Sequence, residues 1–213
     1  MTRKERYKIL IDYFSVAMPA PKSELTYANE WGLLVAVVLS AQCTDKRINT
    51  VTPALMARYP KPSDMAASSV EEIFSYIKSV SYPNAKAEHL FKTAAILQNL
   101  NNDEVPSTRE QLESLPGVGR KTASVMLSVA FDTPAMPVDT HVFRVSHRIG
   151  LVAKAAKTPL AVEKELVQGF PYEMLGDAHH WLILHGRYVC TAISPKCNEC
   201  KIISACQKPV NLM

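Results

Sequence analysis

Hydrophobic residues return at helical spacing along most of the chain. From Lys4 to Val16 they recur every three or four positions, which predicts an amphipathic helix. Pro19 and Pro21 end that segment. The stretch Asn29–Gln42 is apolar on every side in its middle. Its central run alone fits a buried strand as well, but no partner strand lies nearby in the sequence, so we expect a core helix.

Capping residues place the other boundaries. Thr44 or Asp45 is expected to cap a helix that ends before Pro60. The segments 69–72 and 107–110 match the capping box, in which a serine and a glutamate satisfy each other's backbone N–H groups. An extended linker with two prolines spans 132–137. Further helices are predicted over 85–100, 109–115, 120–131, 139–149, 159–169 and 174–188. The sequence therefore predicts an all-α protein with an internal boundary at 132–138.

Composition narrows the class of protein only slightly. The 213 residues are 47% hydrophobic and 21% charged, as in ordinary globular proteins, and the net charge of +4 favours a polyanionic partner only weakly. Asp12 interrupts the N-terminal apolar stretch, which argues against a signal peptide. The longest apolar run, Leu33–Leu39, falls short of the roughly 20 residues that cross a bilayer. We expect a cytoplasmic protein with no membrane partner.

Four of the five cysteines form a cluster near the C-terminus. Cys190, Cys197, Cys200 and Cys206 have the spacing C-x6-C-x2-C-x5-C, and four thiolates so close in sequence predict a metal centre. Structural zinc sites usually contain two short knuckles and only one C-x2-C is present, whereas iron–sulfur clusters accept varied spacings. Spacing alone leaves zinc and iron–sulfur open. Cys43 stands apart and is expected to be a small buried hydrophobe.

Two predicted helices are joined by Pro116-Gly-Val-Gly119, followed directly by Arg120 and Lys121. Backbone N–H groups at a helix start bind phosphate, and glycines allow close approach. A simple connector between two helices is the alternative. Helix dipoles, Arg120 and partial burial are each expected to lower the pKa of Lys121. A neutral amine forms Schiff bases, but a solvated phosphate contact fits the same spacing.

Several motifs together resemble one known family. LPGVGRKTA (115–123), VDTHVFRVSHRIGL (138–151), HHWLILHGRYVC (179–190) and the four-cysteine tail resemble the endonuclease III family of helix-hairpin-helix DNA glycosylases and abasic-site lyases, from about Tyr27 to Cys206. The resemblance implies two helical lobes: 23–133 with the hairpin, and 1–22 plus 134–213 with a [4Fe–4S] cluster on the four cysteines. It also implies a monomer, of bacterial type and associated with the nucleoid, that binds double-stranded DNA containing damaged bases or abasic sites.

The resemblance also implies a reaction and its residues. Oxidised pyrimidines are excised through a Schiff base on Lys121, Asp139 assists in addition to capping its helix, and the strand is cleaved by β-elimination. Gln42 enters the gap left by the rotated nucleotide. Tyr82 takes the usual leucine position of a second wedge, but Pro83 departs from the family pattern, so the lesion preference is expected to differ. The expected phosphate or pocket contacts are Gly117, Val118, Gly119, Arg120, His141, Arg144 and Lys196.

Three other functions compete with this one. A monofunctional mismatch glycosylase of the adenine-specific kind belongs to the same superfamily, but such enzymes generally lack a lysine at this position. A non-enzymatic DNA-binding module would use the hairpin and the cluster only to hold phosphates. A redox protein would use the cluster alone and would not need the glycine hairpin.

Overall fold

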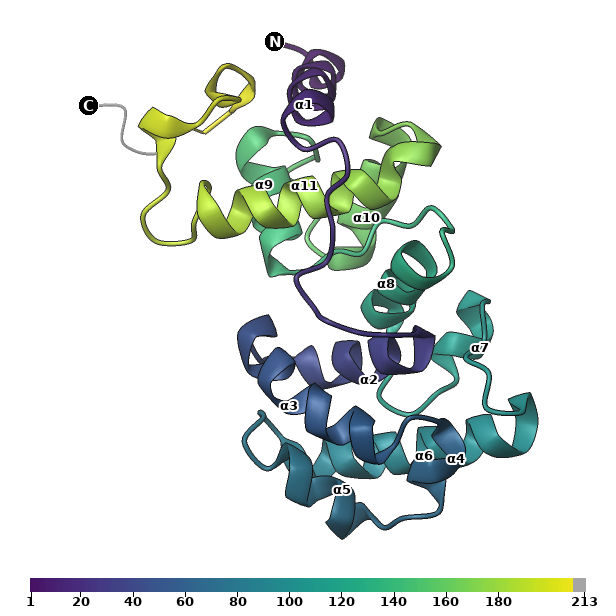
Figure 1. The fold of residues 1–213 in the computed structure, drawn as a ribbon. Helices are drawn as coiled ribbons and strands as arrows, with labels where there is room; N and C mark the ends of the chain where they lie inside the picture. Colours follow the sequence, from purple (N-terminus) through teal and green to yellow (C-terminus); the bar gives the residue numbers. More distant parts are fainter. Residues whose placement is uncertain (209–213) are drawn as a thin grey trace. The chain divides into compact units, whose positions relative to one another are not determined.

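The computed structural model describes residues 1–208, and within that range it contains helices and no β-strand (Figure 1). The all-helical class is thus confirmed. The chain divides into two compact units. One consists of Ser23–Thr133, and the other joins Met1–Lys22 to the chain from Pro134 onward. The chain passes from one unit to the other twice, and the second connection lies within the extended linker predicted over 132–137.

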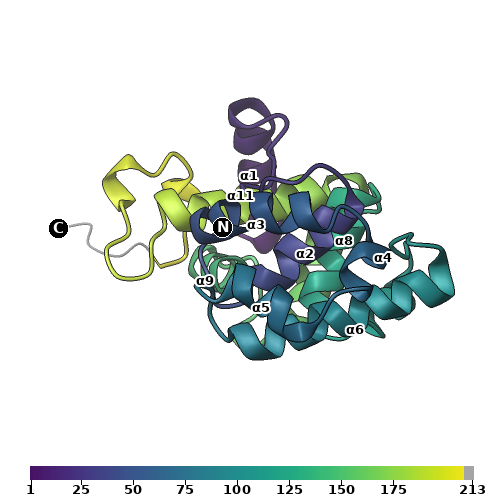
Figure 2. The ribbon, with the colours of Figure 1, turned by 60° about the horizontal axis from the view of Figure 1, so that its bottom comes forward.

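The unit Ser23–Thr133 is built around one buried helix. Its elements are α2 (Glu30–Ser40), α3 (Asp45–Arg58), α4 (Pro62–Ala66), α5 (Val70–Ile77), α6 (Pro83–Asn101), α7 (Arg109–Glu113) and α8 (Arg120–Ala130). Every residue of α2 from Trp31 to Leu39 is buried, as its apolar composition predicted. The helices α3 and α8 pack against α2, and α6 lies beside α4 and α5 (Figures 1 and 2).

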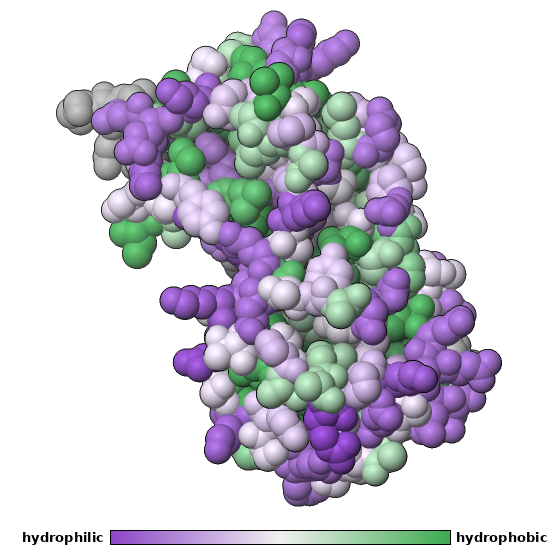
Figure 3. All heavy atoms as spheres, in the orientation of Figure 1, coloured by the Kyte–Doolittle hydropathy of each residue, from purple (hydrophilic) through white to green (hydrophobic). Residues whose placement is uncertain are grey.

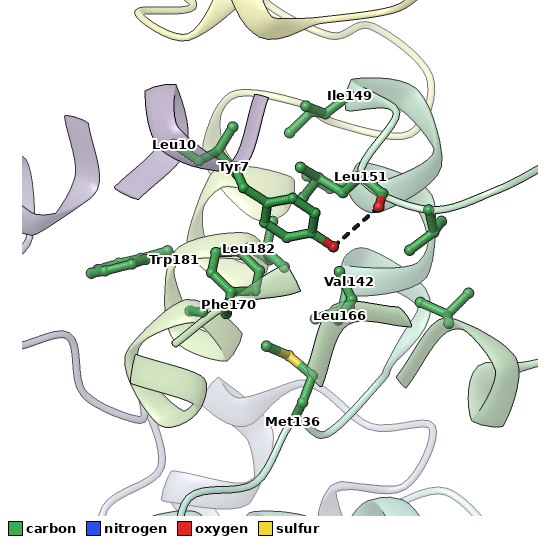
Figure 4. Close-up of a cluster of buried hydrophobic side chains, with 14 of the residues drawn as sticks. Tyr7, Leu10, Met136, Val142, Ile149, Leu151, Leu166, Phe170, Trp181 and Leu182 are labelled. Carbon is green, nitrogen blue, oxygen red and sulfur yellow. Dashed lines mark hydrogen bonds between the residues drawn. The ribbon is translucent and has the colours of Figure 1, made fainter. Parts of the chain in front are cut away.

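The second unit contains both the start and the end of the described chain. Its elements are α1 (Arg3–Ala17), α9 (Thr140–Ile149), α10 (Pro159–Gly169), η1 (Tyr172–Met174), α11 (Leu175–Tyr188), η2 (Cys197–Glu199) and η3 (Ile203–Ala205). Figure 4 shows its core, in which Tyr7 and Leu10 of α1 lie among side chains of the later helices. The buried Tyr7 hydroxyl donates to the Leu151 carbonyl at 3.1 Å. The first helix is therefore an integral part of this unit.

Most predicted helix starts are confirmed. Thr44 and Thr158 cap α3 and α10 through their hydroxyl groups. The box at 107–110 was placed one residue early, because Thr108 caps α7 and bonds with Gln111. At Ser69 only half of the predicted box forms, since the Glu72 carboxylate pairs with Arg58.

The surface gives no sign of a membrane-spanning segment. Within residues 1–208, no helix combines the length and the apolar character needed to cross a bilayer. On the face drawn in Figure 3, hydrophobic residues occupy small, separate areas among hydrophilic ones. This distribution fits helices whose apolar sides are buried in the cores of the two units.

Candidate functional site

The predicted hairpin is present in the unit Ser23–Thr133 and is braced from two sides. Arg109 of α7 donates to the Ser124 hydroxyl of α8 at 3.0 Å, which ties the two helices together. Thr93 of α6 donates to the Pro116 carbonyl at 3.1 Å. The segment between the helices is therefore held in one conformation rather than left as a loose connector.

The two glycines of the hairpin serve different purposes. Gly117 has a left-handed backbone with φ of 78°, and a Cβ built on it would lie 2.8 Å from Nδ1 of His89. A side chain is thus excluded there by conformation and by space. Gly119 has φ of −96° and nothing within 4 Å of such a Cβ. Since any residue would fit there in this structure, the open space beside exposed Gly119 suits the close approach of another molecule.

Val118 does not fit its predicted role as a DNA contact. Its side chain is 5% exposed, and its N–H donates to the Leu115 carbonyl at 3.0 Å. Neither the side chain nor the amide is available to a phosphate. Val118 instead anchors the hairpin in the core, as an apolar residue between two exposed glycines would.

Lys121 and Arg120 lie in the first turn of α8 and are both exposed. The expectation of partial burial for Lys121 was therefore wrong. The reason is geometric: α8 turns Ala123–Leu127 into the core, and Lys121 precedes that buried run. Two of the expected influences on the Lys121 amine are present: it lies at the positive end of the helix dipole, and the preceding residue carries a guanidinium.

The structure brings Gln42 and Tyr82 together. Gln42 follows the end of α2 and Tyr82 precedes the start of α6, and the Ser81 hydroxyl donates to the Gln42 carbonyl at 2.7 Å. Both residues are exposed and have left-handed backbones, with φ of 55° and 53°. That conformation costs a non-glycine residue roughly 1–2 kcal/mol, and for Tyr82 the following proline disfavours it further. Neighbouring Cys43 is half-buried rather than buried as predicted.

Sequence reasoning assigned no role to Lys86, which lies between these two segments. Its side chain is 6% exposed, and Nζ donates to the carbonyls of Leu39 at 2.8 Å and Ala41 at 2.7 Å. Burial lowers the pKa of this ammonium group. One signal was present in the sequence, since a lysine in the first turn of a helix is electrostatically unfavourable unless it binds another partner.

In the other unit, Asp139 caps α9 as predicted. Its Oδ1 accepts from the Val142 N–H at 2.8 Å. Nδ1 of His179, a buried residue of α11, lies 2.8 Å from the Pro137 carbonyl. The segment leading to the cap is thus fixed to α11. A carboxylate held in this way keeps one orientation, which is what an electrostatic role in catalysis requires.

Arg144 holds two helices of this unit together, and its predicted contact with DNA stays a prediction. Its Nη2 donates to the carbonyls of Gly186 at 2.8 Å and Cys190 at 3.1 Å, so the guanidinium fastens α9 to the end of α11. His141 lies next to it, with Nδ1 3.3 Å from that Nη2, and is half-buried. Lys196 is exposed.

The four clustered cysteines line one pocket in this unit. Arg148 of α9 also lines it, and donates to the carbonyls of Thr191 at 2.6 Å and Ala192 at 2.8 Å and to Sγ of Cys190 at 3.5 Å. The 190–206 segment is therefore organised by helix α9.

The thiols of this pocket suit a positively charged centre. Burial and the neighbouring thiols raise the pKa of the Cys200 and Cys206 thiols, so thiolates gathered here need a positive partner. Four cysteine thiolates are a ligand set for either a zinc ion or an iron–sulfur cluster.

Comparison with known proteins places this arrangement in a class. The model of the HhH-GPD superfamily base excision DNA repair proteins matches residues 35–171. Endonuclease III of Rickettsia conorii is 46% identical over 203 residues, covering 95% of this chain and 96% of that protein. Endonuclease III of Escherichia coli K12 is 45% identical over 189 residues, covering 89% of each.

A solved structure agrees with the sequence matches. A trapped Endonuclease III–DNA covalent intermediate is 42% identical, with a TM-score of 0.92 and coverage of 98% of both chains. The chain therefore belongs to the endonuclease III family within the HhH-GPD superfamily, and the resemblance found in its motifs is confirmed.

Proposed function

We propose that this protein is a bifunctional DNA repair enzyme that removes oxidised pyrimidines from duplex DNA and cleaves the resulting abasic strand, with Lys121 as the nucleophile. The observation that carries the proposal is the exposed amine of Lys121, two residues after the braced segment Pro116–Gly119, in a chain of the endonuclease III family. The similar protein in the solved structure was trapped as a covalent intermediate with DNA. A covalent intermediate requires a nucleophile, and a lysine amine is suited to that role.

The proposed reaction starts with attack by the neutral Lys121 amine on C1′ of an extruded nucleotide. The bond from C1′ to the base breaks, and the base leaves with the electron pair and takes up a proton. The C1′–O4′ bond then breaks and the sugar ring opens, a proton passes from the attached amine to O4′, and a protonated imine remains. Loss of a proton from C2′ then expels the 3′ phosphate, which is β-elimination.

Asp139 would stabilise the positive charge that develops on the sugar as the base departs. Its fixed position as the cap of α9 supports this role, since one carboxylate oxygen is already oriented by the Val142 N–H. Backbone groups at Gly117 and Gly119, together with Arg120, would hold the phosphates beside the lesion. Gln42 and Tyr82 would occupy the space that the extruded nucleotide leaves. His141 and Lys196 remain proposed contacts to DNA.

We also propose that the four cysteines hold a [4Fe–4S] cluster, the cofactor of this family. The pocket that all four cysteines line supports a bound centre, and membership of the endonuclease III family favours a cluster over zinc. When bound, the cluster would supply the positive centre that four thiolates need and would fix the 191–196 loop, which carries Lys196. Chromosomal DNA as substrate would place the enzyme at the nucleoid of the cytoplasm.

The decisive experiment compares Lys121→Ala with Lys121→Arg. Each variant is incubated with duplexes that contain thymine glycol, a plain abasic site or no lesion, with and without borohydride. The wild-type protein is expected to give a trapped covalent adduct and strand cleavage on the first two duplexes. Arginine keeps the positive charge but forms no Schiff base, so Lys121→Arg should still bind damaged duplex without trapping or cleavage.

Two results would overturn the assignment. Trapping by Lys121→Ala at the wild-type level would exclude Lys121 as the nucleophile. Base removal by the wild-type protein with no trapped adduct would indicate a monofunctional glycosylase that uses water.

A further inference from the structure

We propose that Lys86 is a positioning residue that holds Gln42 and Tyr82 as a single insertion element for opening the duplex. The proposal rests on the proposed function, because it takes Gln42 and Tyr82 as the side chains that enter the DNA. It goes further because it gives a role in base extrusion to a buried lysine that does not contact DNA.

Lys86 binds the carbonyl groups at the end of α2. The last carbonyls of a helix have no partner inside the helix, and in many helices a glycine just after the last turn allows backbone N–H groups to bind them. No glycine follows α2, whose next residues are Ala41 and Gln42. The ammonium group of Lys86 takes that place, donating to the Leu39 carbonyl at 2.8 Å and the Ala41 carbonyl at 2.7 Å.

Every carbonyl from Leu39 to Gln42 has a partner. The Ser40 carbonyl accepts from the Cys43 N–H at 2.9 Å, and the Gln42 carbonyl accepts from the Ser81 hydroxyl at 2.7 Å. Three of these four acceptors are bound by residues 81 and 86, which flank Tyr82. The Lys86 N–H also donates to the Tyr82 carbonyl at 3.2 Å. Lys86 thus links the turn just before Gln42 to the start of α6 that follows Tyr82, and Ser81 binds the Gln42 backbone itself.

The backbones of both insertion residues are strained. Gln42 and Tyr82 have left-handed backbones, a conformation that persists in non-glycine residues only where the surroundings fix it. Their side chains are exposed, with Tyr82 at 64%, so core packing of those side chains does not supply the constraint. The hydrogen bonds from Lys86 and Ser81 do. Because both residues are already ordered before DNA binds, little conformational entropy has to be lost when the nucleotide is extruded.

Two other roles for Lys86 fail on the same observations. A phosphate contact requires an accessible ammonium group, and this side chain is only 6% exposed. A second nucleophile requires an amine that reaches the substrate, and this Nζ is bound beneath the turn that carries Gln42. Because of its buried position, Lys86 can influence DNA only through the residues whose backbone it holds in place.

The test compares two reactions of the full-length protein under single-turnover conditions. One is base excision from a duplex with thymine glycol, which requires extrusion of a stacked nucleotide. The other is cleavage at a pre-formed abasic site, where no base has to be unstacked. Lys86→Met keeps the length of the side chain but leaves the two carbonyls without their donor. We expect its excision rate to fall between about 10-fold and 100-fold, with cleavage at the abasic site and borohydride trapping there unchanged.

Matched variants separate positioning from general damage. Lys92→Met makes the same change on the same helix, where the ammonium group only pairs with Glu88 at the surface, and should leave both reactions unchanged. Lys86→Arg, which retains N–H donors for the carbonyls, should recover part of the lost excision rate. Ser81→Ala removes only the bond to the Gln42 carbonyl and should show a smaller loss in the same direction.

A double variant identifies the residue through which Lys86 acts. In a Gln42→Ala background, the loss caused by Lys86→Met should be much smaller than in the wild-type background. The proposal is overturned if Lys86→Met lowers both reactions equally, or if the losses from the two substitutions multiply in full. A wild-type protein that neither excises the base nor cleaves the abasic site would instead refute the proposed function.

Discussion

Asp139 combines a structural role that the structure shows with a catalytic role that we propose, and two substitutions separate them. Asp139→Asn keeps an oxygen that accepts the Val142 N–H and removes the negative charge. Asp139→Ala removes both. Because asparagine caps helices about as well as aspartate, the two variants should lose catalysis alike and differ in stability.

The stability difference follows from the one bond that the alanine variant loses. The Asp139 Oδ1 accepts from the Val142 N–H at 2.8 Å in a half-buried position. Replacing such a cap by alanine costs about 1 kcal/mol of unfolding free energy, which in a protein of this size lowers the melting temperature by about 2–4 °C. Asparagine keeps this bond and loses only the charge–dipole contribution, which alanine loses as well, so the two variants differ by the hydrogen bond.

The catalytic loss should be the same for both variants, because neither has a carboxylate. Removal of one fixed group that stabilises charge in the transition state typically slows a reaction by roughly 100-fold to 1,000-fold. Thermal unfolding followed by circular dichroism gives the stability, and single-turnover excision of thymine glycol gives the rate. If Asp139→Asn excises at the wild-type rate, the carboxylate is only a cap. If the alanine variant melts no lower than the asparagine variant, the hydrogen bond contributes no stability.

Two further predictions concern the hairpin and the cysteines. Gly117→Ala should lower the free energy of unfolding by at least about 1 kcal/mol, measured by urea denaturation, because its backbone is left-handed and its Cβ would meet His89. Gly119→Ala should leave that free energy nearly unchanged but weaken binding to an abasic duplex in a fluorescence anisotropy titration, and equal destabilisation by both would contradict the space seen at Gly119. Cys197→Ser should reduce the iron content of the purified protein and expose the 191–196 loop to proteolysis, whereas the control Cys43→Ser should leave both unchanged.

Sequence reasoning succeeded where the signal is local. Asp139 before a helical pattern that runs to 149 predicted α9, because a cap depends on residues within one turn. It erred where side chains compete for partners. The predicted capping box at Ser69 lost its second half to Arg58, which lies 14 positions before Glu72, and no local pattern contains that information.

The candidate site was predictable as a set of residues but not as an arrangement. Lys121 and Gly119 follow from spacing, whereas the burial of Val118 beside them depends on how the hairpin packs. Lys86 meets Leu39 across 47 positions of sequence. The sequence could not show that Arg144, expected to contact a phosphate or the pocket, also binds backbone carbonyls more than 40 residues away.

The split of one unit between the two ends of the chain has a consequence for synthesis on the ribosome. Residues 23–133 emerge as one continuous piece, so that unit can fold while the rest is still being translated. Helix α1 emerges before this unit, yet the partners of Tyr7, Leu10 and Phe14 come from residues after 134. The nascent protein therefore exposes the apolar side of α1 until those later helices have been translated, and a ribosome stalled before then would leave that side as a binding site for chaperones.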